Sequence, residues 1–219
     1  TRIKECLAIE SSKMQQALVG AGHAKSYVRA LSYIEPVFYY NDQVDGVGYF
    51  ETITELLKDY ENSFEELSNT LKEMAEYIFT KENLLVSFTG QVEGLNEVNK
   101  LLPEFVKDLY DAKPLADPFV FTPNQQNEGF KAPYDVNYVA LVGNYKKDNL
   151  PYTGALQVFQ NAISTDYLWT NVRVLGGAYG CMCGFTGTGI SYFVSYRDPN
   201  LTKTLETYKN VLSYIDNFN

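Results

Sequence analysis

Two side chains that could act on a peptide bond, Arg173 and Tyr179, lie six positions apart near the C-terminal end of the sequence. A guanidinium and a phenol both donate hydrogen bonds, either to a peptide carbonyl or to the oxyanion that develops when that carbonyl is attacked. Gly176 and Gly177 lie between them. The residues alone leave a second interpretation open, in which the arginine caps helix carbonyls and the tyrosine is a half-buried structural residue.

Other catalytic constellations are hard to build from these residues. The chain has a single histidine, His23, so a zinc motif with paired histidines cannot form within it. No Gly-x-Ser-x-Gly elbow is present to support a nucleophilic serine. Asp and Glu number 27, but sequence spacing alone singles out no acid/base pair. We therefore expect no catalytic residue in this chain, and we interpret His23 as a structural residue near the start of a helix.

The cysteines predict core packing rather than a metal centre or a disulfide framework. Cys181 and Cys183 are separated by one residue in a predicted strand, so both thiols face the same side. Further soft ligands would have to come from Cys6 and His23. We expect no metal ion on this chain, and the odd number of cysteines, three, fits a reducing compartment such as the cytoplasm.

The composition excludes several classes of protein. With 219 residues, 45% hydrophobic and 21% charged, the chain is long enough to fold around a core. Its net charge of −9 has the wrong sign for tracking phosphates, so nucleic acid is an unexpected partner. The apolar runs are far shorter than the roughly 18 residues of a membrane helix, and we expect no membrane association. The glycines from 176 to 189 follow a predicted helix and run into strands, which is the reverse of a dinucleotide fingerprint.

Helices dominate the predicted first half. Apolar residues recur at helical spacing in four segments, with Gly20 and Pro36 as stop signals and Pro103 kinking or splitting the last helix. These segments are 2–18, 24–34, 50–78 (one or two helices, with a break near 61–63) and 92–109. The short apolar run 84–89 is interpreted as a strand. The proline-rich stretch 111–133 predicts an extended connection.

Strands and helices alternate in the predicted second half. A strand is expected at 136–142, a helix or helix pair at 154–174, and a hairpin of two strands, 178–185 and 190–197, around Thr-Gly-Thr-Gly. Asp198 and Pro199 are expected to start a closing helix. The order predicts an α+β fold in which helices cover a mostly antiparallel sheet.

Two motifs carry a resemblance to a known family. The run Arg173-Val-Leu-Gly-Gly-Ala-Tyr179-Gly180, with Ser195-Tyr-Arg-Asp-Pro-Asn200 after it, resembles the C-terminal module of presequence proteases, which are zinc metallopeptidases of the insulinase (pitrilysin) superfamily. Weaker similarity to the preceding module lies at Gly22-His23, Arg29-Ala30 and Gly46.

The resemblance implies a larger hydrolase built from four related α/β modules around a chamber in which unfolded peptides are degraded. Its zinc would be held in the first module, outside this chain. Residues 1–112 would be the helical and final-strand part of the third module, 113–135 a linker, and 136–219 the first half of the fourth module. The chain is then interpreted as a C-terminal fragment.

The resemblance also assigns the site. Arg173 and Tyr179 match the pair that reaches across the chamber to the substrate beside the zinc, and Gly176 and Gly177 match the family's paired glycines. The expected partners are peptide substrates and the N-terminal half of the same protein. An alternative from another class is a non-catalytic peptide-binding or structural subunit of the same fold, which an upstream sequence without H-x-x-E-H would favour.

Overall fold

The computed structural model of the chain describes residues 2–113 and 119–217. The chain divides into two compact units, one of Thr1–Leu57 with Phe121–Asn219 and one of Lys58–Val120. Helices and an antiparallel sheet together confirm the predicted α+β class. Among the described residues, no helix has both the length and the apolar character needed to cross a membrane.

The sheet of the first unit carries the candidate site. Its strands among the described residues are β1 (Ala140–Asn144), β2 (Gly180–Phe185) and β3 (Ile190–Tyr196). The order is β1-β3-β2 with both pairings antiparallel, so β3 is central, with Val194 opposite both Ala140 and Met182. The Thr-Gly-Thr-Gly hairpin between β2 and β3 is confirmed. The first strand begins four residues later than predicted, because residue 137 makes only an isolated bridge to Asp198.

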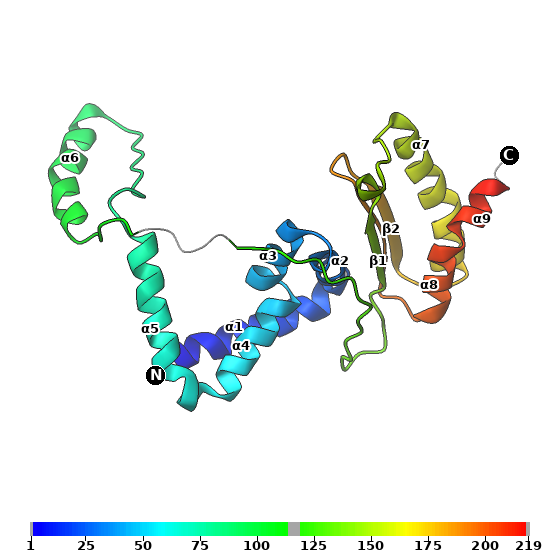
Figure 1. Cartoon of the computed structure of the whole chain (residues 1–219), viewed down its shortest axis with the longest axis horizontal. Helices are drawn as coiled ribbons and strands as arrows, with labels where there is room; N and C mark the ends of the chain where they lie inside the picture. Colours follow the sequence, from blue (N-terminus) through cyan, green and yellow to red (C-terminus); the bar gives the residue numbers. More distant parts are fainter. Residues whose placement is uncertain (1, 114–118, 218–219) are drawn as a thin grey trace. The chain divides into compact units, whose positions relative to one another are not determined.

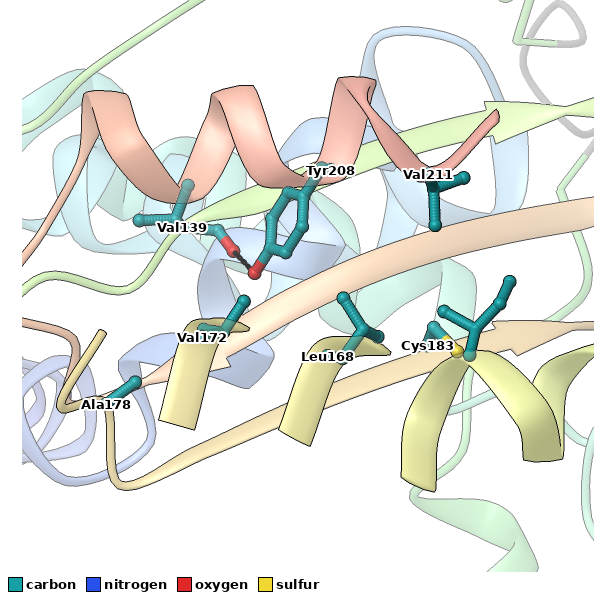
Figure 2. Packing of buried hydrophobic residues seen from close by; sticks show 8 residues of the cluster. Val139, Leu168, Val172, Ala178, Cys183, Tyr208 and Val211 are labelled. Atoms are coloured by element: carbon teal, nitrogen blue, oxygen red, sulfur yellow. Dashed lines mark hydrogen bonds between the residues drawn. The ribbon is translucent and has the colours of Figure 1, made fainter. Parts of the chain in front are cut away.

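One face of the sheet packs on helices of the second half of the chain. These are α7 (Gly154–Ala162) and η2 (Ile163–Val174), which lie between β1 and β2 in sequence, and α8 (Thr202–Lys209) and α9 (Val211–Asp216), which follow β3. Figure 2 shows the core that results, in which the Tyr208 hydroxyl donates to the Val139 carbonyl at 3.4 Å. Its buried members are Val139, Ile163, Leu168, Val172, Ala178, Cys183, Tyr208 and Val211.

The opposite face of the sheet is covered by α2 (Gly22–Ser32), which lies on the other side of the strands in Figure 1. Tyr27 of α2 meets Tyr192 of β3 edge-on, with ring centroids 4.9 Å apart. Leu31 is fully buried in the same layer. The remaining helices of the unit are α1 (Arg2–Gly20), α3 (Pro36–Asp45) and α4 (Val47–Lys58), with a short 3₁₀ helix, η1, at Tyr145–Asp148. Gly20 ends α1, as predicted. Pro36 was predicted as a stop signal, but α2 already ends at Ser32 and Pro36 is the first residue of α3, where its fixed φ suits the first helical position.

Arg29 of α2 helps to join the helical layer to the segment that was predicted to be an extended connection. Arg29 of α2 pairs with the fully buried Asp42 at 2.8 Å and forms two hydrogen bonds with Glu128 at 2.8 and 3.0 Å. Asp42 also accepts the backbone N–H groups of Val47 and Gly48, which satisfies free donors at the start of α4. Glu128 is thereby fixed against α2, so this part of the extended stretch 111–133 is packed on the unit.

The second unit contains α5 (Tyr60–Ile78) and α6 (Val92–Lys107). The break after α4 falls at Asp59, close to the predicted 61–63, and α6 runs through Pro103 without splitting. The predicted strand at 84–89 is wrong. A strand needs a partner for its backbone groups, and the pairing in the described part of this unit is a bridge between Thr80 and Tyr110, while Leu85 is 90% exposed. The assignment of 1–112 and 136–219 to two modules stays a prediction.

The Arg29 junction gives a test of stability against pH. Hydrogen bonds from Arg29 hold the pKa of Glu128 below its ordinary value of 4.5. A lowered pKa in the folded state means that the carboxylate stabilises the fold above pH 4.5 and loses this effect as pH falls through the folded-state pKa. Glu128→Gln should lower the free energy of unfolding at pH 7 by about 1 kcal/mol, because the pair is partly open to water.

Urea unfolding of the unaltered protein and of Glu128→Gln between pH 3 and pH 7 measures the difference in their free energies of unfolding. Glu65→Gln, at an exposed position of α5, is the control. This difference should disappear as the pH falls and Glu128 becomes protonated. A difference that stays constant over the whole range would contradict the ion-pair account.

Candidate functional site

Arg173 lies in the last turn of η2, which has the wide register of a π-helix. Its hydrogen bonds include Leu175 N to Thr170 O, five residues back, at 2.9 Å. The fully buried residues Ile163, Leu168 and Val172 are accordingly spaced by five and four positions. Sequence periodicity predicted a helix here but not this register. Because π turns are rare and often occur at functional sites, the end of η2 is a candidate site on geometry alone.

The Arg173 side chain is held between two aromatic rings. Its guanidinium carbon lies 4.6 Å from the centroid of the Trp169 ring and 5.8 Å from that of Tyr179. Nη1 donates a hydrogen bond to the carbonyl oxygen of Tyr179. The two rings remain open to solvent, with Trp169 52% and Tyr179 68% exposed. Arg173 and Tyr179, predicted as a pair from sequence, therefore lie in contact on the surface.

The glycines between them form the turn that reverses the chain into β2. Gly177 has a φ of +82°, in the left-handed region, and its N–H bonds to the carbonyl of Arg173 at 2.9 Å. A Cβ on Gly176 would lie 2.4 Å from the Val172 carbonyl oxygen. The backbone N–H groups of Gly177 and Ala178 cap the helix, which the arginine side chain was expected to do in the structural interpretation. Both glycines are thus needed by the turn itself.

A second turn, after β3, fixes the first. Tyr179 N–H donates to the carbonyl of Tyr196 at 3.0 Å, and the Asn200 side chain donates to the carbonyl of Gly176 at 2.6 Å. Asp198 is fully buried and accepts from Asn200 N–H at 2.8 Å and from Thr204 Oγ1 at 2.7 Å. Asp198 was expected to start the closing helix directly. It closes a turn instead, and α8 begins at Thr202, after three further residues of the connection.

Aromatic rings connect this site to the start of α2. Tyr196 contacts Tyr179 edge-on, with centroids 6.3 Å apart, and His23 at 4.8 Å. His23 is the second residue of α2, as the structural interpretation predicts. The guanidinium carbon of Arg197 lies 5.6 Å from the Tyr196 ring centroid, so a second arginine flanks the site.

The two thiols of β2 point away from this surface and into the core, as predicted. Cys183 is buried, and Cys181 lies 3.6 Å from the Tyr208 hydroxyl. Burial raises the pKa of Cys181 to about 12, so its thiol stays protonated and is a poor metal ligand. In residues 2–113 and 119–217, no group of three or more His, Cys, Asp or Glu side chains is placed to hold a metal ion.

Trp169 is the part of this arrangement that sequence reasoning did not identify. It was counted as one apolar position of a predicted helix. A signal was available, since Trp169 and Arg173 are four positions apart and such residues are neighbours on a helix surface.

Comparison with known proteins relates the chain to one family. Residues 127–218 match the family described as PreP C-terminal domain. Over 99% of its length, the chain is 32% identical to "Protein HypA" of Clostridium perfringens. It is 30% identical over 94% of its length to "Presequence protease 1, chloroplastic/mitochondrial" of Arabidopsis thaliana, and 28% identical over 99% to "Presequence protease, mitochondrial" of Saccharomyces cerevisiae.

The chain is presequence protease-like: it is similar to these proteases over nearly its whole length, and residues 127–218 match their C-terminal domain. It spans 22%, 19% and 23% of the lengths of these three relatives, about a fifth in each case. The matched family region contains Arg173, Gly176, Gly177 and Tyr179. The homology supports a peptidase-related part.

The left-handed turn gives a test of how the site is held. Gly177→Ala should destabilise the chain by about 1–2 kcal/mol, because an alanine in this backbone region brings its Cβ too close to the following carbonyl. Gly187→Ala is the matched control, since nothing lies within 4 Å of a Cβ built there. Thermal unfolding of the two variants measures the difference. Equal melting temperatures would show that the turn does not depend on the glycine.

Proposed function

We propose that this chain supplies the substrate-binding surface of a zinc-dependent oligopeptidase, with Arg173 and Tyr179 as the residues that bind the peptide. The observation that carries the proposal is their placement. Both side chains project from a turn whose backbone groups are bonded within the protein, and the Tyr179 ring remains mostly exposed. Similarity to presequence proteases supports a peptidase, and the exposed donors give this chain a role in it.

The chemistry of the two side chains suits a peptide carbonyl. Arg173 carries five N–H donors and a permanent positive charge, and the bond to the Tyr179 carbonyl uses one of these donors. The remaining donors can bind a substrate carbonyl and stabilise negative charge that develops on its oxygen. Tyr179 adds a neutral hydroxyl donor from the neighbouring position. Gly176 and Gly177 act at this site by letting the backbone turn closely beneath the pair.

The family resemblance implies a zinc ion in the parent enzyme, where it would activate water for attack on the peptide. The described residues of this chain do not fit that ion, since its one imidazole, His23, lies among aromatic rings and not in a cluster of ligands. The proposal therefore places the zinc on another part of the same protein. That part is also the expected partner, because an exposed pair of donors needs a second surface to enclose a substrate.

Arg173→Ala in the full-length, zinc-loaded protein tests the proposal. Cleavage of an unfolded peptide should fall by about 10²–10³-fold in kcat, as expected for loss of one oxyanion donor. Tyr179→Phe should also lower the rate, because it removes a donor and keeps the ring. Arg2→Ala, an exposed arginine of α1, is the matched control and should cleave at the unaltered rate.

A zinc chelator should abolish cleavage by the unaltered protein. Unchanged turnover by the Arg173→Ala enzyme would refute the role of that residue. A folded, zinc-supplied full-length protein that cleaves no peptide would refute the enzymatic proposal and favour a peptide-binding subunit.

A further inference from the structure

The stack of Trp169, Arg173 and Tyr179 raises a question that the substrate-binding proposal leaves open. An arginine side chain on a surface is flexible, and holding it in one geometry costs up to about 2 kcal/mol of rotamer entropy. A donor that must meet a carbonyl within a narrow range of distances works best when this cost is met before the substrate arrives. The Trp169 ring is placed to restrict the Arg173 side chain before the substrate binds.

Trp169 is anchored by its neighbours in sequence. Leu168 and Val172 are buried in the core and lie four positions apart on η2. Trp169 and Arg173 each follow one of these anchors by a single residue and keep the same spacing. The buried pair therefore sets the spacing of Trp169 and Arg173 along η2. The guanidinium carbon lies 4.6 Å from the indole centroid, which is within the range of a cation–π contact.

We propose that Trp169 is a positioning residue that holds the Arg173 guanidinium over its indole face, ready to bind the substrate carbonyl. This inference rests on the proposed function of Arg173. Tyr179 restricts the position of the guanidinium as well. The guanidinium carbon lies 5.8 Å from the Tyr179 ring centroid, and the guanidinium donates a hydrogen bond to the Tyr179 carbonyl. In this proposal Trp169 affects cleavage only by positioning Arg173 and does not itself bind the substrate.

A double-mutant cycle in the full-length, zinc-loaded enzyme separates this role from direct substrate contact. Trp169→Ala should lower kcat/KM for peptide cleavage by about twofold to fivefold, the range of a surface cation–π contact. In the Arg173→Ala background the same substitution should have no further effect. Trp169→Phe keeps an aromatic face and should retain most of the activity. Val174→Ala, an exposed neighbour on η2, is the matched control.

The outcomes distinguish the two proposals. If Arg173→Ala leaves cleavage unchanged, the proposed function fails and the inference fails with it. If Arg173→Ala impairs cleavage but Trp169→Ala does not, only the inference fails. Equal effects of Trp169→Ala in both backgrounds would show that Trp169 acts independently of Arg173, which also overturns the inference.

Fluorescence provides a readout that needs no activity. Trp169 is the single tryptophan of the 219-residue chain, so its emission reports on the stack directly. Arg173→Ala should shift the emission or change its intensity, because the indole face loses the guanidinium and gains water. Arg2→Ala should leave the spectrum unchanged. An Arg173→Ala chain with the spectrum of the unaltered protein would show that the stack does not form in solution.

Discussion

The buried carboxyl group of Asp198 is the constraint on which the geometry of the site depends. It accepts the N–H of Asn200 and the hydroxyl of Thr204, so the turn between β3 and α8 closes around it. The backbone of Asp198 also exchanges two hydrogen bonds with Asn137, at 2.7 and 2.9 Å, just before β1. The same turn supplies the side chain of Asn200 to Gly176. The turn that the Asp198 carboxyl group closes therefore contacts the segments before β1 and before β2, and a buried acceptor left unpaired here would be costly.

The helical layer uses the same device at its own junction. Asp42 is as fully buried as Asp198, and its carboxylate accepts the backbone N–H groups of Val47 and Gly48 at the start of α4. It differs in having a cationic partner, Arg29, which extends the network to Glu128. In both cases an aspartate fixes a chain reversal that apolar packing alone would leave undetermined. The sheet is covered on both faces, and a buried aspartate organises each side.

Local signals in the sequence predicted most of the elements, and the family resemblance singled out Arg173 and Tyr179. Gly20, Pro36 and the Thr-Gly-Thr-Gly turn act through the conformation of their own backbone, so their effect is visible within a few residues. The stretch 84–89 has the composition of a strand but finds no partner in the described chain, and pairing is a long-range property. Arg29 and Glu128 are 99 positions apart, so their contact carries no local signature. The π register of η2 was not predicted from the sequence, because a five-residue spacing of apolar positions resembles an irregular α-helical pattern.

The site is an open surface, which limits what it can do alone. A cavity of about 230 Å³ in the first unit is lined by residues around Arg29 and Asp42, and not by Arg173 or Tyr179. Hydrogen bonds to a charged group gain strength as water is excluded, and more than half of Trp169 and Tyr179 is exposed here. Within the proposed function, a facing surface must therefore complete the enclosure before Arg173 can stabilise a developing oxyanion effectively. In this proposal the turn and the aromatic stack both fix the position of Arg173 and Tyr179 before the substrate binds, and the facing surface then encloses the substrate.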